Sequence, residues 1–179
     1  MQCIQEPEGA DASSALFKYL TRNMIDKQLL KQTVERAIEG TDLFLVDLRI
    51  SPDNDITVEI DSAGEGVDID SCVAITRRIE AEFDRDVEDY QLEVGSAGLT
   101  SPFKVKGQYL KNIGNEIGIL TRDGRKLSGR LVEVGDAGFT VEVPVKVKHE
   151  GAKRPVIEQQ PQTFAFDDCK SVCYKIDFK

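Results

Sequence analysis

The spacing of apolar residues changes near Pro102, and this change constrains the fold more than any other feature of the sequence. Before Pro102, segments with apolar residues at helical spacing alternate with short runs in which every second residue is apolar. After Pro102, short alternating runs follow one another and are separated by turns that contain glycine. Because the two patterns bury their apolar faces in different ways, the sequence predicts an α+β protein of two domains.

The first pattern predicts a helix, two strands that form a hairpin, a second helix and a third strand. The helices are expected over residues 26–39 and 68–83, and the strands over residues 44–50, 56–61 and 90–94. Gly40 suits the left-handed residue at the end of the first helix, and Asp68 or Asp70 suits the cap of the second. Both helices pack most simply on one face of a three-stranded sheet. We therefore expect an N-terminal α/β domain over residues 24–101, preceded by a disordered extension over residues 1–23.

The second pattern predicts a small β-barrel of the SH3 or Sm type over residues 116–179. Five short strands are expected over residues 116–121, 126–134, 139–145, 163–166 and 172–178. They must close on one another to bury their inner faces. A connecting segment over residues 102–115 is expected to hold a short helix that ends at Gly114. Residues 146–161 are expected to form a long loop.

Charge is distributed unevenly between the two halves of the chain. Residues 1–102 hold 9 Lys and Arg against 22 Asp and Glu, a net charge of −13, whereas residues 103–179 hold 14 against 10, a net charge of +4. An acidic surface repels phosphate and attracts basic proteins, while a basic surface does the reverse. This asymmetry favours different partners for the two halves, although an acidic excess can also serve solubility alone.

Several classes of protein are disfavoured by residues that the chain lacks. No stretch reaches the roughly 18 to 20 apolar residues of a membrane span, and residues 1–11 carry acids instead of a basic signal-peptide start. Cys3, Cys72, Cys169 and Cys173 form no Cys-x-x-Cys pair, and His149 is the single histidine. We therefore expect a cytoplasmic protein with no membrane contact, no metal and no cofactor, and one that is not an enzyme.

Two segments are candidates for binding. Gly95-Ser96-Ala97-Gly98, followed by Leu99, has the letters of the Gly-x-x-Gly loop that clamps nucleic-acid backbone in KH domains. A structural turn that aims the chain at the second domain, in which Gly98 can take a positive φ, explains the segment better. The segment 146–155 is basic and suits contact with RNA phosphates, but no aromatic residue lies within it, and a solvated loop is the alternative. Its cations are Lys146, Lys148, Lys153 and Arg154.

Four segments together resemble the ribosome maturation factor RimP family. They are Phe44-Leu45-Val46-Asp47, the strand at 56–61, the helix start at 67–72, and Leu92-Glu93-Val94 with its continuation through Pro102-Phe103. The resemblance covers residues 24–179 and implies an α/β N-terminal domain with an SH3-like C-terminal barrel. It also implies a non-enzymatic role in maturation of the small (30S) ribosomal subunit, with binding to the precursor particle near ribosomal protein twelve and 16S rRNA.

The segment at 95–102 departs from the pattern of the family. Where many members read Ser-Ser-Pro-Gly-Leu-Asp-Arg-Pro, this chain reads Gly-Ser-Ala-Gly-Leu-Thr-Ser-Pro. A role that depends on the missing arginine cannot be carried over. An Sm-like general regulator that binds RNA is the alternative function, and an enzyme with an unrecognised site is a third. We expect a monomer in each case.

Overall fold

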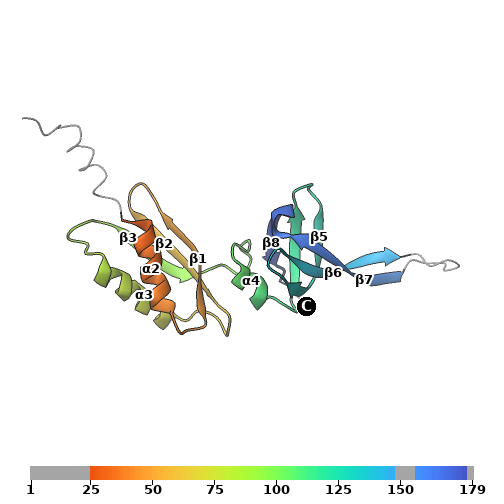
Figure 1. Ribbon diagram of the computed structural model, residues 1–179, viewed down its shortest axis with the longest axis horizontal. Helices are drawn as coiled ribbons and strands as arrows, with labels where there is room; N and C mark the ends of the chain where they lie inside the picture. Colours follow the sequence, from red (N-terminus) through yellow and green to blue (C-terminus); the bar gives the residue numbers. More distant parts are fainter. Residues whose placement is uncertain (1–24, 148–155, 177–179) are drawn as a thin grey trace, which may run out of the picture.

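The computed structural model describes residues 25–147 and 156–176, so the extension expected over residues 1–23 lies outside the described residues. Within these ranges the chain is α+β, with three α-helices, a three-stranded sheet and a five-stranded antiparallel sheet (Figure 1). The first half contains α2 (Lys27–Ile38), β1 (Leu43–Ile50), β2 (Asp55–Ser62), α3 (Ile69–Glu82) and β3 (Gln91–Ser96). The order of elements predicted for this half is confirmed.

The two long helices begin at the capping residues that the sequence offers. The Asp26 carboxylate accepts the backbone N–H groups of Gln28 and Leu29, and the Asp68 carboxylate accepts that of Ser71. These bonds satisfy N–H groups that a helix leaves unpaired in its first turn. After α2 the chain turns at Gly40, which has a φ of 78°. Both the Asp68 cap and the left-handed Gly40 agree with the sequence-based expectation.

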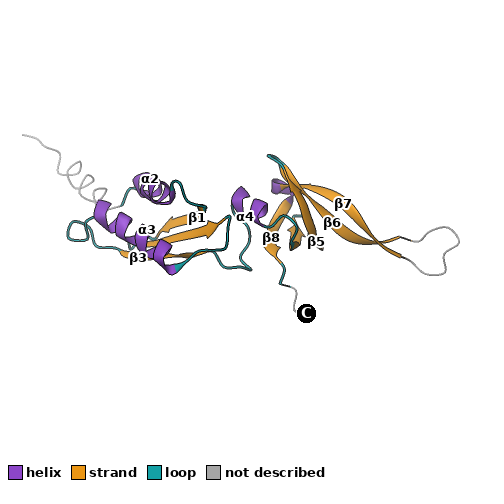
Figure 2. Ribbon diagram, turned by 90° about the horizontal axis from the view of Figure 1, so that it is seen from below, coloured by secondary structure: helices purple, strands orange, loops and turns teal. Residues whose placement is uncertain are grey.

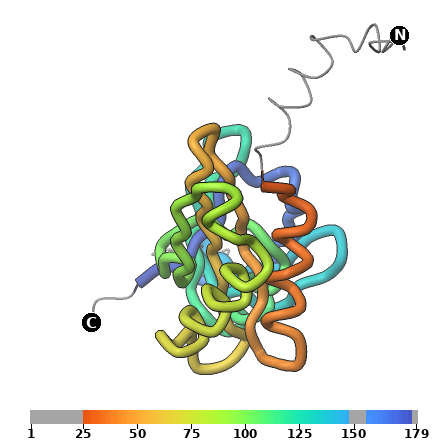
Figure 3. Tube along the Cα trace, turned by 90° about the vertical axis from the view of Figure 1, so that its left-hand side faces the viewer, coloured from red at the N-terminus to blue at the C-terminus, as the bar shows by residue number. Residues whose placement is uncertain are grey.

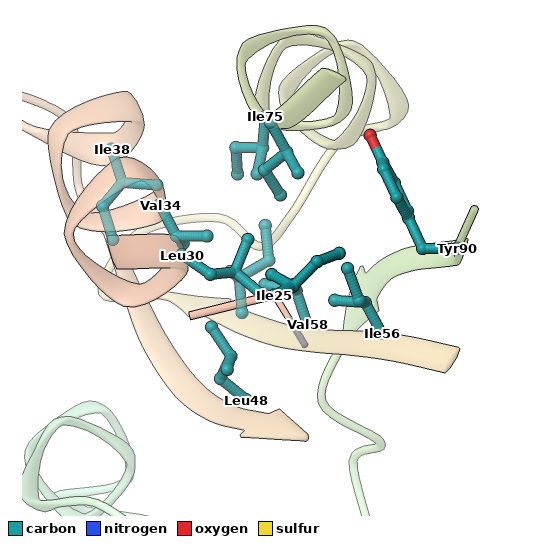
Figure 4. Packing of buried hydrophobic residues seen from close by; sticks show 11 residues of the cluster. Ile25, Leu30, Val34, Ile38, Leu48, Ile56, Val58, Ile75 and Tyr90 are labelled. Carbon is teal, nitrogen blue, oxygen red and sulfur yellow. The ribbon is translucent and has the colours of Figure 1, made fainter. Parts of the chain in front are cut away.

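Helices α2 and α3 cover one face of the three-stranded sheet. The strand order is β1-β2-β3, with β1 and β2 antiparallel and β2 and β3 parallel. Leu30 and Val34 on α2, Ile75 and Ile79 on α3, and Val58 on β2 are at most 1% exposed and meet in one core (Figure 4). Figure 3, viewed from this end of the molecule, shows the two helices side by side. No long helix of the described residues lies on the opposite face of the sheet, here called the open face (Figure 2).

A β-bulge in β1 changes which of its residues face the core. Leu45 pairs with Ile60 and Asp47 pairs with Glu59, so Val46 is the extra residue. The alternation expected from Phe44 through Ile50 is therefore interrupted, because an inserted residue shifts the side-chain alternation by one position. Leu45 packs against the first core, whereas Phe44, which pairs with Asp61 on β2, turns to the open face.

The second half of the chain forms a five-stranded antiparallel sheet with the order β7-β6-β5-β4-β8. Its elements are α4 (Lys106–Lys111), β4 (Glu116–Thr121), β5 (Lys126–Val134), β6 (Gly138–Val147), β7 (Val156–Ala165), the 3₁₀ helix η1 (Phe166–Asp168) and β8 (Cys169–Tyr174). Side chains from all five strands share one core, centred on Phe139, which is 1% exposed. The sheet therefore curls around this core.

The strand pairing does not close this sheet into the barrel expected from the sequence. In the described part of the chain, β7 pairs only with β6 and β8 only with β4, so these two strands are the sheet's edges. The η1 turn connects them directly, which brings the edges toward each other without a ladder between them. The second half is thus a curled open sheet, and we call the border between β7 and β8, which η1 connects but no ladder joins in the described ranges, the seam.

The expectation of a long loop over residues 146–161 is wrong at 146–147 and 156–161, where β6 and β7 form a paired ribbon. Residues 148–155 lie outside the described residues. Their register runs from Gly138 opposite Ala165 to Val147 opposite Val156, whereas β5 pairs with β6 only as far as Glu142. Residues 143–147 and 156–160 therefore pair only with each other and project beyond the sheet (Figures 1 and 2). Pro161 is tolerated because β7 is an edge strand, where one side of the backbone needs no donor.

Candidate functional site

The segment from Gly95 to Leu99 lies at the junction between the two sheets. Gly95 and Ser96 are the last residues of β3, and Leu99 is 71% exposed. Ser96, Ala97, Gly98 and Leu99 line a cavity of about 390 Å³, together with the turn at 64–66 and residues of α4. The Ala97 N–H donates to the Ile60 carbonyl at 2.9 Å, so this backbone donor is already paired.

Gly98 does not have the positive φ that the sequence suggested. The glycines with positive φ are Gly40, Gly66, Gly114 and Gly124 among the described residues. A Cβ on Gly98 would approach the Ser101 hydroxyl at 2.9 Å, which is the end of a short side chain that can rotate away. The segment therefore has neither the left-handed turn we expected nor the helix-to-helix setting of a KH loop.

The segment 103–111 connects the open face of the three-stranded sheet to the five-stranded sheet. Its backbone is fixed on the second sheet, because the Phe103 N–H donates to the Val172 carbonyl at 2.7 Å and Tyr109 is buried in the second core. The side of the segment that faces the first sheet packs against the Phe44 ring. A Cβ on Gly107 would lie 2.9 Å from a carbon of this ring, so only glycine allows α4 to pack this closely.

Two lysines of the same segment bind carboxylates on the open face. Lys104 Nζ lies 2.7 Å from Asp47 Oδ2 and 2.8 Å from Glu59 Oε2. Lys111 Nζ lies 2.6 Å from Asp61 Oδ1. Together with the contact of Phe44 and Gly107, these ion pairs form an interface that we call the lysine clamp. It positions the open face relative to α4.

The electrostatics of the clamp follow from these contacts. The hydrogen bond from Lys104 lowers the pKa of Asp47 below its ordinary value of 3.8. The hydrogen bonds to Asp47 and Glu59 in turn raise the pKa of Lys104 above 10.5. Both groups therefore stay charged at neutral pH, and each stabilises the charged form of the other.

The basic residues predicted from the sequence lie elsewhere. Lys146 is exposed on the projecting ribbon of β6 and β7, which leaves the second sheet on the side away from the first (Figures 1 and 2). Lys148, Lys153 and Arg154 lie outside the described residues, as does His149. The segment 95–99 thus lines the junction cavity, whereas Lys146, the described cation of the second candidate segment, lies on the ribbon.

The sequence missed a second cavity, of about 340 Å³, beside α4. Phe103, Tyr109 and Phe166 line it together with Lys104, Lys106 and Lys170. These residues lie far apart in the sequence and meet only in the folded chain. No local pattern of residues signals such a gathering.

The described part of the chain contains neither a metal-binding cluster nor a membrane-spanning helix. No group of three or more His, Cys, Asp or Glu side chains there is placed to hold a metal ion. None of the helices described is long and apolar enough to cross a membrane. The free thiols of Cys72, Cys169 and Cys173 are partly buried, and burial raises the pKa of Cys72 and Cys169.

Comparison with known proteins identifies the family. Residues 33–100 match the RimP N-terminal domain. The ribosome maturation factor RimP of Porphyromonas gingivalis strain W83 is 46% identical over 147 residues, which cover 82% of this chain and 96% of that protein. The RimP protein of Flavobacterium psychrophilum is 38% identical over 120 residues, which cover 66% of this chain and 77% of that protein. The RimP protein of Cytophaga hutchinsonii is 30% identical over 151 residues, which cover 79% of this chain and 90% of that protein. The chain therefore belongs to the ribosome maturation factor RimP family.

Proposed function

We propose that this chain is a non-enzymatic, cytoplasmic factor for maturation of the small (30S) ribosomal subunit. In this proposal a monomer binds the precursor particle through ribosomal protein twelve and through 16S rRNA. Membership of the RimP family carries the proposal, because the relatives are named as ribosome maturation factors. The opposite charges of the two halves support a division between a basic protein partner and RNA.

The open face of the three-stranded sheet supports a basic protein as one partner. Asp47 and Glu59 on this face bind the Lys104 ammonium. Asp55 and Glu93 lie on the same face and are exposed. Contact of these carboxylates with lysine or arginine side chains of a ribosomal protein would be of the same kind as the lysine clamp.

The projecting ribbon supports RNA as the other partner. It carries Lys146 and connects to a segment whose sequence adds Lys148, Lys153 and Arg154. Cations on an extended ribbon reach phosphates without requiring a groove on the protein. We assign backbone contacts with rRNA to this end of the molecule.

We also propose that the two sheets belong to separate domains, at residues 24–101 and 116–179, connected by residues 102–115. The two buried cores share no residue in the described ranges, which supports this division. The second domain would be an SH3-like barrel that is open at the seam between β7 and β8. Limited proteolysis should then cut within residues 98–102, which are mostly exposed and precede the packed segment 103–111, and should release fragments that stay folded. Fragments that unfold as soon as the chain is cut there would oppose the division.

Deletion of the gene tests the function directly. Ribosome profiles of the deletion strain should show fewer mature small subunits and an accumulation of their precursors, and a plasmid copy should restore the profile. The purified protein should co-sediment with the precursor particles. Normal maturation of the small subunit in the deletion strain would contradict the proposal.

The alternative, an Sm-like general RNA regulator, predicts a different binding preference. Such a regulator would bind free RNA as tightly as it binds particles, with affinity that falls steeply as salt rises. An assembly factor should bind the precursor particle much more tightly than naked RNA. Sedimentation and filter binding over a salt series separate the two functions.

The role of the ribbon is tested by reversing four cations together. The variant Lys146→Glu, Lys148→Glu, Lys153→Glu and Arg154→Glu should weaken binding to particles and reduce its dependence on salt. A control with the same change of net charge reverses exposed cations on α2 and α3, namely Lys27, Arg36, Arg77 and Arg78. If both variants lose affinity equally, the ribbon has no specific role.

A further inference from the structure

The second cavity lies where segment 103–109 meets η1 and β8 of the curled sheet. Its volume of about 340 Å³ is near the lower end of the range for small-molecule sites, about 300 to 1,000 Å³. Three aromatic rings and three lysines line it. They are Phe103, Tyr109, Phe166, Lys104, Lys106 and Lys170.

The aromatic rings form a compact group that is only partly covered. The ring centroid of Tyr109 lies 5.0 Å from that of Phe103 and 5.0 Å from that of Phe166, with edge-to-face geometry in both pairs. Tyr109 is 7% exposed, while Phe103 and Phe166 are half-buried. The two phenylalanines therefore offer aromatic surface to the cavity on either side of the tyrosine.

The Tyr109 hydroxyl has no hydrogen-bond partner among the described residues. Burial and the neighbouring Cys169 raise the pKa of Tyr109 to about 12, so the hydroxyl keeps its proton. The described part of the chain holds no fully buried side-chain oxygen without a partner. The hydroxyl is therefore not fully buried, and Tyr109 is one of the residues that line the cavity. A protonated, unpaired donor inside an aromatic cavity is suited to a polar group on a flat ligand.

The lysines give the cavity an attraction for anions. Lys170 on β8 is exposed and has no ion pair within the described ranges. Lys106 binds Asp136 at 2.5 Å, but Asp136 is fully exposed, and surface pairs of this kind exchange partners at little cost. Lys104 is held by the lysine clamp. Two of the three lysines are thus able to turn to a phosphate.

We propose that this cavity binds one nucleotide of single-stranded RNA. The base lies against the Phe103 and Phe166 rings and hydrogen-bonds to the Tyr109 hydroxyl, while Lys106 and Lys170 bind the flanking phosphates. Stacking of an unpaired base on aromatic side chains, with cations beside the backbone, is a general way in which proteins hold single-stranded RNA. The inference rests on the proposed function for the source of the RNA, which would be an unpaired stretch of rRNA.

Charge and shape favour RNA over an acidic peptide at this place. An acidic peptide would provide carboxylates for the lysines. It would cover the two phenylalanine rings only where it happened to carry an aromatic side chain. A nucleotide supplies a flat base, hydrogen-bonding edges and a phosphate in one unit. The basic segment at 146–155 has no aromatic residue, so the cavity adds the stacking surface that the ribbon lacks.

The test is a titration of the full chain with hexauridylate and hexaadenylate, followed by NMR shifts and by fluorescence anisotropy of labelled oligonucleotide. We expect binding with a Kd on the order of 10⁻⁴ M, with shifts centred on residues that line the cavity. Tyr109→Phe removes only the hydroxyl and should weaken binding about threefold to tenfold. Lys170→Glu should weaken oligonucleotide binding about tenfold. It should also reduce the slope of log affinity against log salt concentration by about the amount of one phosphate contact.

The control is Lys27→Glu, which reverses an exposed cation on α2 and should leave oligonucleotide binding unchanged. Equal losses in Lys27→Glu and Lys170→Glu would overturn the proposal, as would an unchanged affinity in Tyr109→Phe. Inorganic polyphosphate or an acidic peptide that shifts the same residues as strongly as RNA would also overturn it, since neither supplies a base.

A second measurement separates this inference from the proposed function. If the wild-type protein co-sediments with precursor particles but no oligonucleotide shifts the cavity residues, the nucleotide site is wrong and the assembly role stands. If oligonucleotides bind at the cavity but the deletion strain matures its small subunits normally, the nucleotide site stands and the assembly role is wrong.

Discussion

Lys111 on α4 holds Asp61 on β2 across the junction of the two sheets, with 2.6 Å between Nζ and Oδ1. Asp61 is only 8% exposed, and its carboxylate also accepts the Ser62 N–H at 2.8 Å. The pair therefore differs from an ordinary surface ion pair, because removal of the lysine leaves a carboxylate with little access to water.

The variant Lys111→Met should lower the free energy of unfolding by about 1 to 3 kcal/mol, because the Asp61 carboxylate loses its cation and stays mostly buried. Urea denaturation measures this. Lys106→Met is the matched control, since its partner Asp136 is fully exposed and its loss should have no measurable effect. If Lys111→Met is as stable as the control, the clamp at Asp61 does not contribute to stability.

The stability of the protein should depend on pH through Asp47. The pKa of this carboxyl is lowered in the folded state, so the unfolded chain takes up the proton first as the pH falls. The stability from the Lys104 pair is therefore present above the ordinary pKa of 3.8 and is lost as the pH falls toward the lower, folded value. Lys104→Met should flatten the decrease in the free energy of unfolding between about pH 6 and about pH 2.

The matched control for this pH series is Lys31→Met, which removes an exposed pair with Glu35 at 3.7 Å on α2. The control should keep the slope of the wild-type protein. A wild-type slope in Lys104→Met as well would show that the bridge to Asp47 does not form in solution.

Gly107→Ala should disturb the contact between the two sheets. The new Cβ would lie 2.9 Å from the Phe44 ring, which must then move, and overpacking of this kind outweighs the better helix propensity of alanine. We expect a loss of about 1 kcal/mol in stability and a changed radius of gyration in small-angle scattering. Gly95→Ala, which meets nothing within 4 Å, should leave the scattering curve as it is.

Gly98 and Gly129 should respond in opposite ways to alanine. At Gly98 the new Cβ meets only the Ser101 hydroxyl, so Gly98→Ala should change the midpoint of thermal unfolding little. At Gly129 on β5 the new Cβ would overlap the backbone carbonyl of Glu142 on β6, which cannot rotate away. Gly129→Ala should therefore lower the midpoint by several degrees, at roughly 2 to 4 °C per kcal/mol for a chain of this length. Equal midpoints for the two variants would contradict this reading of the backbone contacts.

The sequence predicted elements well where local chemistry decides them. Asp26, Asp68 and Gly40 act at the helix ends because capping depends on a few neighbouring residues. The bulge at Val46 was not predictable, because a bulge depends on pairing with β2 and leaves no mark in the spacing of apolar residues. Phe44 and Leu48 consequently lie on opposite faces of the sheet, although an uninterrupted alternation would place them on the same face.

The extension of β7 was missed for a related reason. Residues 156–162 contain three glutamines and a proline, a composition that favours a loop. Their strand conformation comes from the ladder to β6. Sites assembled from distant segments were missed as well: neither the lysine clamp nor the aromatic cavity has a local sequence signal, since Lys104 and Asp47 meet only after both halves have folded.

The curled sheet can open locally at the seam between β7 and β8. Hydrogen-bond ladders hold β4, β5 and β6 on both sides, whereas β7 and β8 are each held on one side in the described ranges. Transient opening should begin where ladders end, so water reaches the aromatic rings around Phe166 before it reaches Phe139. Amide hydrogens at the seam should therefore exchange faster with solvent than those of the central strands β4, β5 and β6.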